Sequence, residues 1–293
     1  MTTLSYTLIS PTLGVEVAGI DASQPISDAT FATVRALWIQ HLVVRIRGQH
    51  LSDPQLMAFS RCFGELDPPG PNPQGQPYLP EFPELNVISN IKNAGTPVGG
   101  LGDGEAIWHA DMTYIDNPPM AAVLYAIEVP AGQGDTYWAN MHAALDAKPA
   151  PLRPAIDGRE AVHDATYNSA GFKRRGYEGV TDPRKAPGAR HPLIRRHPES
   201  QRECLFLGRR RNAYIVGLPL DESEALLDEL WAHATQPQFT MRQQWREGDL
   251  IIWDNRATLH RRDGFDPSTR RLMHRAQIKG DWVKGNSSLV NLG

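Results

Sequence analysis

The sequence has few cysteines, no long apolar run and no excess of basic charge, and each of these absences excludes a class of protein. Two cysteines in 293 residues, Cys62 and Cys204, predict no disulfide framework and favour a reducing compartment such as the cytoplasm. The formal net charge of −3 provides no attraction to nucleic acid or to an anionic membrane. The first residues show no secretory signal, and the apolar run 120–127 is too short to span a bilayer. We therefore expect neither a nucleic-acid partner nor a membrane partner.

The composition predicts one large hydrophobic core. With 41% hydrophobic residues, the chain is long enough for a single domain over residues 1–293. Capping residues and apolar periodicity predict helices from Ser27 to about Gln40, from Ser52 to near Gly64 and over 221–234. Short apolar runs at 42–46, 85–89 and 120–127 predict strands. The sequence therefore indicates a β-rich core with helices outside it.

The feature with the most chemical content is the pair His109 and Asp111, together with His260 far downstream. Two imidazoles and one carboxylate can hold Fe(II) on one face and leave the opposite face open. On an extended segment, residues i and i+2 point to the same side, so His109 and Asp111 can bind one metal ion. The run 250–253 predicts a buried strand with His260 on its continuation. Taken alone, the pair could equally be a hydrogen-bonded core histidine and a capping aspartate.

The stretch after His260 is rich in arginine. Residues 263–269 have the composition of a turn, which predicts a hairpin with residues 270–278 as its return strand. Arg271 and Arg275 then share one face of that strand, where a guanidinium requires an anionic partner because it cannot lose its charge. Arg261 and Arg262 are expected to be solvated.

Taken in order along the chain, these features resemble the Fe(II)/2-oxoglutarate-dependent dioxygenases typified by taurine dioxygenase and 2,4-dichlorophenoxyacetate dioxygenase. The resemblance covers about residues 5–282. The matching segments are Gly14–Asp21, Trp108–Asp111, Gly134–Thr136, His191–Pro192, Gly248–Asp249, Trp253–His260 and Arg271–Arg275. The resemblance implies a mainly β fold with flanking helices (α+β), a double-stranded β-helix or jelly roll of the cupin-like kind.

The resemblance also implies a role for individual residues. His109, Asp111 and His260 match the iron ligands. Arg271 and Thr136 match the pair that binds the distal carboxylate of 2-oxoglutarate. Arg275 matches an arginine that holds the anionic group of the substrate in the taurine enzyme. From the residues alone, Arg275 requires only some anionic partner.

The sequence departs from the taurine enzyme at a substrate position. That enzyme binds the sulfonate with a histidine after a Phe-Gly-x-Leu turn, whereas the turn 63–66 here is followed by Asp67 and no histidine occurs between His50 and His109. Taurine is therefore not the expected substrate. Asp67 is a candidate substrate-binding residue that would favour a cationic group, and the alternative is a capping or turn role.

Two irregular segments are predicted to be lids over the iron. Residues 68–83 are dense in proline and glycine, and residues 169–190 combine glycines with basic side chains. Long loops without secondary structure in a compact domain are usually functional or disordered. Lids suit an oxidising site because they exclude water from it, whereas the alternative is that both are solvated surface loops.

The resemblance predicts an oxidoreductase that uses Fe(II), 2-oxoglutarate as cosubstrate and O2. It would couple oxidative decarboxylation of 2-oxoglutarate to succinate and CO2 with hydroxylation of an unactivated C–H bond of a small, anionic organic substrate. Desaturation or epoxidation at the same site is an alternative, as is a non-catalytic jelly-roll binding protein with a vestigial or zinc-filled site. The sequence names neither the substrate nor the oligomeric state, and a homo-oligomer is compatible with it.

Overall fold

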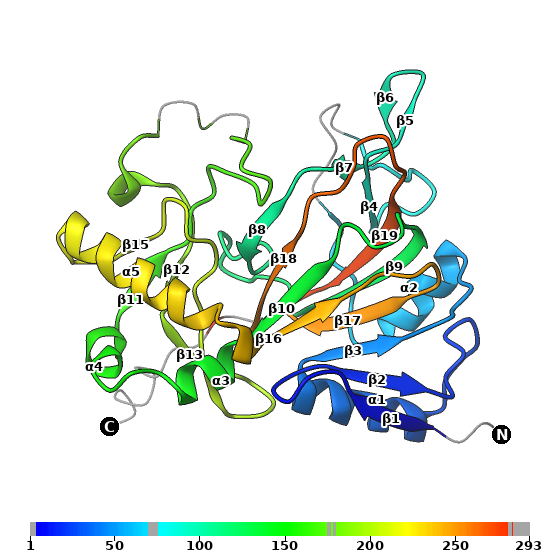
Figure 1. Ribbon diagram of the computed structural model, residues 1–293, viewed down its shortest axis with the longest axis horizontal. Helices are drawn as coiled ribbons and strands as arrows, with labels where there is room; N and C mark the ends of the chain where they lie inside the picture. The colour runs from blue at the N-terminus through cyan, green and yellow to red at the C-terminus, as the bar shows by residue number, and fades with distance from the viewer. Residues whose placement is uncertain (1–3, 70–75, 175–176, 178–179, 281–282, 284–293) are drawn as a thin grey trace.

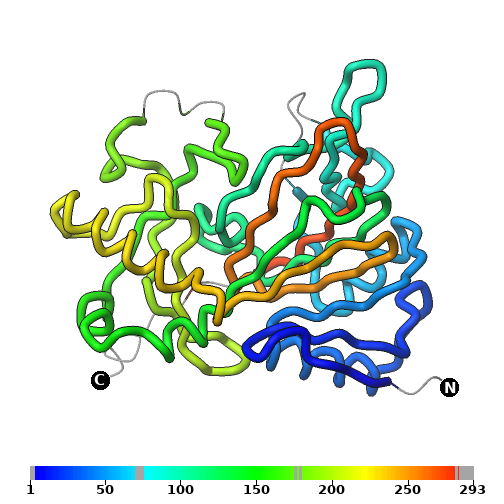
Figure 2. The backbone as a smooth tube through the Cα atoms, in the orientation of Figure 1, coloured from blue at the N-terminus to red at the C-terminus, as the bar shows by residue number. Residues whose placement is uncertain are grey.

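The computed structural model describes residues 4–69, 76–174, 177, 180–280 and 283. Its two largest sheets are rich in antiparallel pairs, and helices lie outside them (Figures 1 and 2). The larger sheet contains, in spatial order, β1 (Ser5–Leu8), β2 (Val15–Ala18), β3 (Val43–Ile46), β17 (Leu250–Asp254), β9 (Ala121–Glu128), β19 (Leu272–Ile278), β4 (Leu85–Ser89) and β7 (Gly100–Leu101). The smaller sheet contains β16 (Thr240–Gln243), β10 (Thr136–Asn140), β18 (Thr258–Arg262) and β8 (Ala106–His109).

The two sheets pack face to face over a shared apolar core. Trp138 of β10 lies 5.7 Å from Trp253 of β17, measured between ring centroids, and Met241, Ile251 and Met273 fill the space around them. The other face of the larger sheet is covered by α1 (Asp28–His41) and α2 (Asp53–Arg61). β17 is buried at every position because both of its faces are covered, which explains the apolar run Leu250–Trp253 before its final Asp254.

The helices on the larger sheet begin where the sequence predicts them. Ser27 accepts a hydrogen bond from the backbone N–H of Thr30 and caps α1. Ser52 and Gln55 form a capping box at the start of α2. The predicted helix 221–234 is α5 (Leu220–Ala234). The predictions at 42–46, 85–89 and 120–127 correspond to β3, β4 and β9.

A third group of elements, between β10 and β16 in sequence, covers the outer face of the smaller sheet. Ala139 and Leu259, which alternate with the inward-facing Trp138 and His260, pack against this group. Besides α5, its elements are α3 (Met141–Asp146), α4 (Leu152–Ile156), β11 (Glu160–Val162), β12 (Arg190–Pro192), β13 (Ile194–Arg196), β14 (Glu203–Leu205), β15 (Tyr214–Ile215) and the 3-10 turns Pro183–Lys185 and Pro237–Phe239. β5 (Lys92–Asn93) and β6 (Thr96–Pro97) form a separate small hairpin.

Two connections differ from the sequence-based expectation. β18 does not continue β17 and does not form a hairpin with β19, because β17 and β19 lie in the larger sheet and β18 in the smaller one. The turn at Asn255–Ala257 moves the chain from one sheet to the other, and residues 263–271 bring it back. Strand composition and turn residues indicate where a strand ends but not which sheet the next strand joins.

The predicted mainly β structure with a few flanking helices is confirmed. Among the described residues, no helix combines the length and the apolarity needed to cross a membrane.

Candidate active site

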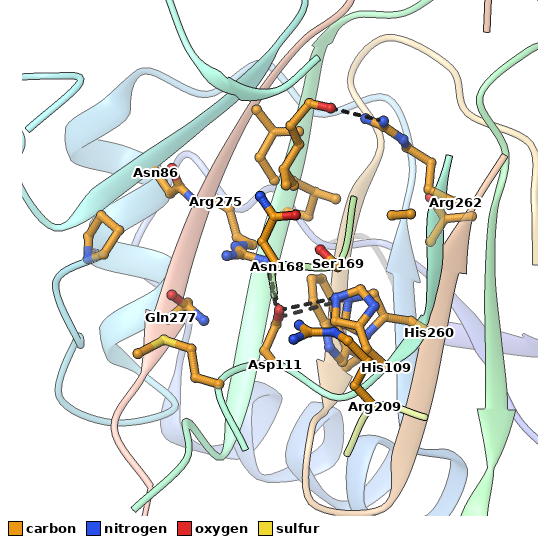
Figure 3. A pocket seen from close by; sticks show the side chains of 18 of the residues that line it. Asn86, His109, Asp111, Asn168, Ser169, Arg209, His260, Arg262, Arg275 and Gln277 are labelled. Atoms are coloured by element: carbon orange, nitrogen blue, oxygen red, sulfur yellow. Dashed lines mark hydrogen bonds and ion pairs between the residues drawn. The ribbon is translucent and has the colours of Figure 1, made fainter. Parts of the chain in front are cut away.

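His109, Asp111 and His260 converge between the two sheets, as predicted (Figure 3). β8 pairs with β18 so that His109 is directly opposite His260, and the centroids of their rings are 4.1 Å apart. The Asp111 carboxylate lies 3.6 Å from His109 Nε2 and 3.9 Å from His260 Nε2. One ligand atom from each residue lies within 4.8 Å of the other two.

The backbone of Asp111 is held by Asn255. The Asn255 side chain accepts a hydrogen bond from the N–H of Asp111 at 2.7 Å and donates one to its carbonyl oxygen at 2.9 Å. The chain turns sharply after Asp111, since Met112 has a φ of 51°. Asp111 is therefore not on the extended strand that the sequence predicts. It reaches the imidazoles because β8 ends at His109 and the chain bends toward them.

The charges at this cluster suit a divalent cation. Burial raises the pKa of Asp111, but Arg275 and the two imidazoles outweigh this and hold the pKa well below its usual range, so the carboxylate is ionised. Burial, followed by the neighbouring His109, lowers the pKa of His260, which is therefore neutral. His109 Nδ1 lies 2.7 Å from the carbonyl oxygen of Ile107, which assigns the proton to Nδ1 and leaves the Nε2 lone pair free. Neutral imidazoles and an ionised carboxylate are the protonation states that a metal requires.

Thr136 and Arg271 form a polar corner beside the cluster. The Thr136 hydroxyl accepts a hydrogen bond from Trp245 Nε1 at 2.9 Å. Arg271 is 1% exposed, and its guanidinium carbon lies 5.7 Å from the ring centroids of both Trp245 and Phe265. Its Nη1 donates to the Gly134 carbonyl oxygen at 2.6 Å, whereas its Nε has no partner.

Arg271 is a buried cation without a carboxylate partner among the described residues. Burial, followed by repulsion from Arg262, lowers its pKa to about 9. Gly134, with a φ of 66°, makes room for it: a Cβ atom there would lie 2.5 Å from Arg271 Nη1. An unpaired buried charge is costly unless a ligand neutralises it. The geometry therefore suits an incoming carboxylate.

A cavity of about 220 Å³ joins the metal-ligand cluster to this corner. His109, Asp111, His260, Thr136 and Arg275 all line it. Arg271 is not a lining residue, but it packs on Trp245, which donates a hydrogen bond to Thr136. The apolar part of the lining includes Ile88, Leu101, Leu124, Trp138 and Trp253. The cavity can thus receive a ligand that has both a polar and an apolar part.

Arg275, on β19, points into the cavity and pairs with the Asp111 carboxylate (Figure 3). Its Nη1 donates to the two carboxylate oxygens at 3.0 and 3.3 Å, and its Nε has no partner. Because Arg275 lines the cavity, an anionic group of a ligand can approach its guanidinium there.

The structure does not bring Asp67 to the cavity. Pro69 is a lining residue and Asp67 is not. The backbone N–H of Asp67 donates to the carbonyl oxygen of Gln277, and its side chain lies near Glu65 and Lys279. Burial raises the pKa of the Asp67 carboxyl. The site that we propose below does not include it.

Two arginines at the cavity, Arg262 and Arg209, were missed by sequence reasoning, whereas Arg174 lies in the predicted lid segment 169–190. Arg262 was expected to be solvated but is 6% exposed and lines the cavity. Its position two residues after His260, on the same face of a strand, was the signal. Arg209 and Arg174 also line the cavity, together with Asn168 and Ser169. These residues lie between regular elements, where no periodicity indicates which side chains point inward.

Comparison with known proteins identifies the family. Residues 5–277 match the family described as taurine catabolism dioxygenase TauD, TfdA family. The chain belongs to this family. It is 33% identical to the alpha-ketoglutarate-dependent 2,4-dichlorophenoxyacetate dioxygenase of Cupriavidus pinatubonensis over 94% of this chain and 97% of that one.

Comparison with solved structures supports the same family assignment. A taurine dioxygenase from Burkholderia xenovorans is 33% identical, with a TM-score of 0.80, and the match covers 97% of this chain and 92% of that one. The structure of AAD-2 in complex with Mn(II) and N-oxalylglycine is 28% identical, with a TM-score of 0.77, over 96% of this chain and 99% of that one. The chain is therefore a 2-oxoglutarate-dependent dioxygenase, as predicted, and Fe(II), 2-oxoglutarate and O2 are the cofactors of this class.

Proposed function

We propose that His109, Asp111 and His260 hold one Fe(II), that Thr136 and Arg271 bind the distal carboxylate of 2-oxoglutarate, and that Arg275 binds an anionic group of the primary substrate. The enzyme hydroxylates an unactivated C–H bond of a small organic acid. The single observation that carries the proposal is the convergence of three ligand atoms within 4.8 Å at a cavity that Thr136 also lines. The buried Arg271, whose Nε has no partner, packs on the Trp245 ring that bonds to Thr136.

When bound, Fe(II) with 2-oxoglutarate and O2 supplies the oxidising chemistry, in which the cosubstrate becomes succinate and CO2 and one oxygen atom enters the substrate. The residues of the chain orient the ligands and neutralise their charges. Arg271 and Thr136 fix one end of the cosubstrate, which positions its 2-oxo acid end toward the imidazoles. The apolar wall around Trp138 and Trp253 keeps water away from the reacting C–H bond.

An anionic substrate is supported by the charges around the cavity. Besides Arg275, Arg209 and Arg174 line it, and neither forms an ion pair with a carboxylate in the described part of the chain. Arg209 donates to the Tyr167 carbonyl oxygen, and Arg174 stacks 3.8 Å from the Tyr114 ring centroid. The relative from Cupriavidus pinatubonensis is named for a phenoxyacetate, which is a carboxylate.

We also propose that the two facing sheets form a double-stranded β-helix within one domain over residues 1–293. The segments 68–83 and 169–190 act as lids, which is supported by Pro69, Ser169 and Arg174 in the cavity wall. Residues 70–75, 175–176 and 178–179 of these segments lie outside the described residues. The expected partner is a small molecule, with no nucleic acid or membrane, in the cytoplasm.

The test is a panel of organic acids incubated aerobically with Fe(II), 2-oxoglutarate and the protein, scored by succinate release. We expect at least one acid to stimulate succinate formation, with a product that has gained one oxygen atom by mass spectrometry. A product that has lost two hydrogen atoms would instead indicate desaturation. Failure of every acid, together with no Fe(II)-dependent consumption of 2-oxoglutarate, would contradict the proposal.

A further inference from the structure

Arg262 occupies a position that the proposed site does not yet use. It lies on β18, two residues after His260, and therefore points to the same face of the smaller sheet. In the β10–β18 register Arg262 is directly opposite Thr136, just as His260 is opposite Trp138. Figure 3 shows Arg262 and Arg275 on opposite sides of the cavity, since they come from facing sheets.

The guanidinium of Arg262 is buried and only partly satisfied. The residue is 6% exposed, and its Nε and Nη1 atoms have no hydrogen-bond partner. Its Nη2 donates to the carbonyl oxygens of Gly104 and Leu101, which anchors the side chain to the segment before β8. It forms no ion pair within 4.0 Å in the part of the chain that the structure describes. Burial lowers the pKa of Arg262 more than the nearby Asp103 carboxylate raises it. Two free donors on a buried cation are expensive unless a ligand accepts from them.

Arg262 and Arg271 meet at one aromatic ring. Their guanidinium carbons lie 5.4 and 5.7 Å from the centroid of Phe265. Thr136 closes the same corner through its bond to Trp245, over which Arg271 also lies. Arg262 and Thr136 therefore line one end of the cavity, and Arg271 packs beside them. Repulsion from Arg262 helps to lower the pKa of Arg271, and an anion near both guanidiniums would remove that cost.

We propose that Arg262 is a second guanidinium for the distal carboxylate of 2-oxoglutarate, acting with Arg271 and Thr136. This inference rests on the proposed function and adds a cosubstrate-binding residue to it. Arg262 also connects the cosubstrate to the segment 101–104 through its carbonyl contacts. The consequence is a strong preference for a 2-oxo acid with a second carboxylate over one without it.

The test is the dissociation constant of 2-oxoglutarate for the Mn(II)-loaded protein, measured by calorimetry without O2 so that no turnover is needed. Arg262→Leu should weaken the binding of 2-oxoglutarate by about 10- to 100-fold, the loss expected for one hydrogen bond to a charged group. 2-Oxopentanoate has a methyl group in place of the distal carboxylate, and its affinity should change less than about threefold. Arg262→Lys, which keeps the charge, should give an intermediate affinity for 2-oxoglutarate.

The matched control is Arg261→Leu. Arg261 is next to Arg262 on the same strand but faces outward, where it pairs with Asp263. Its loss should leave the affinity for 2-oxoglutarate unchanged. Equal affinity of Arg262→Leu and wild-type protein for 2-oxoglutarate would overturn the inference alone. An equal loss for 2-oxoglutarate and 2-oxopentanoate would also overturn it, because Arg262 would then only support the segment 101–104. If wild-type protein bound no 2-oxoglutarate at all, the proposed function itself would fail.

Discussion

The cavity has two walls that are built in different ways. The inner wall contains Thr136 and Arg262, from strands β10 and β18, and is supported by Arg271, the residue before β19, which packs on Trp245. The outer wall, formed by Asn168, Ser169, Arg174 and Arg209, comes from segments between regular elements. Hydrogen-bonded strands hold side chains in a fixed register, whereas connecting segments tolerate change. The difference suggests that the inner wall serves the invariant cosubstrate and the outer wall serves the substrate.

The two walls also differ in how tightly their arginines are enclosed. Arg271 is packed between Trp245 and Phe265, and its guanidinium leaves no room for a side chain at position 134, which is Gly134. Arg174, in contrast, is stacked on a single ring, that of Tyr114, and is partly exposed. A rigid arginine selects one ligand geometry, whereas a less enclosed one can accept several. Substitutions of residues in each wall test this difference.

The largest effect is expected at the metal ligands, on which both walls depend. Asp111→Ala or His260→Ala should abolish succinate formation, because two ligands no longer hold the metal in a fixed geometry. The control is Asp146→Ala, which removes an exposed carboxylate far from the cavity. Turnover in Asp111→Ala at the wild-type rate would show that the three residues do not form the metal site.

The next effect isolates the inner wall. Arg271→Leu should raise the apparent KM for 2-oxoglutarate by about 10²-fold, equivalent to roughly 3 kcal/mol for the loss of a charged hydrogen bond. Steady-state kinetics with varied 2-oxoglutarate measures this directly. Arg270→Leu is the matched control, since Arg270 is the exposed neighbour that pairs with Glu128. An unchanged KM in Arg271→Leu would remove Arg271 from the cosubstrate role.

Substitution of Arg275 should distinguish the binding of the primary substrate from the binding of 2-oxoglutarate. Arg275→Gln should raise the KM for the primary substrate by about tenfold or more, because a charged contact to its anionic group is lost. The KM for 2-oxoglutarate should change less. The opposite pattern would assign Arg275 to the cosubstrate rather than to the substrate.

The smallest effect is expected at the outer wall. Arg209→Gln should weaken the binding of the primary substrate by about three- to tenfold. This loss is smaller than that expected for a fully buried hydrogen bond to a charged group. The affinity for 2-oxoglutarate, measured by calorimetry, should remain that of the wild type. A loss of 2-oxoglutarate affinity with no loss for the substrate would contradict the division between the two walls.

The same division explains what the sequence could predict. The resemblance to the family predicted the cluster and Arg271. The argument from strand alternation was wrong for Asp111, because β8 ends at His109 and the chain bends after it. The hairpin prediction was wrong, since turn residues do not indicate which sheet receives the next strand. Arg262 was predicted to be solvated because an arginine-rich run resembles a surface, although its spacing from His260 places it inward. The composition of 169–190 predicted a lid there but not which of its side chains points inward, and nothing in the sequence indicated Arg209.

The most direct test of the central claim is the stoichiometry of Mn(II) binding, measured by equilibrium dialysis in the presence of 2-oxoglutarate without O2. The account predicts one Mn(II) per wild-type chain, with 2-oxoglutarate strengthening its binding, and strongly weakened binding in Asp111→Ala. Wild-type protein that binds no Mn(II), or an Asp111→Ala variant that binds one equivalent as tightly as the wild type, would contradict the account.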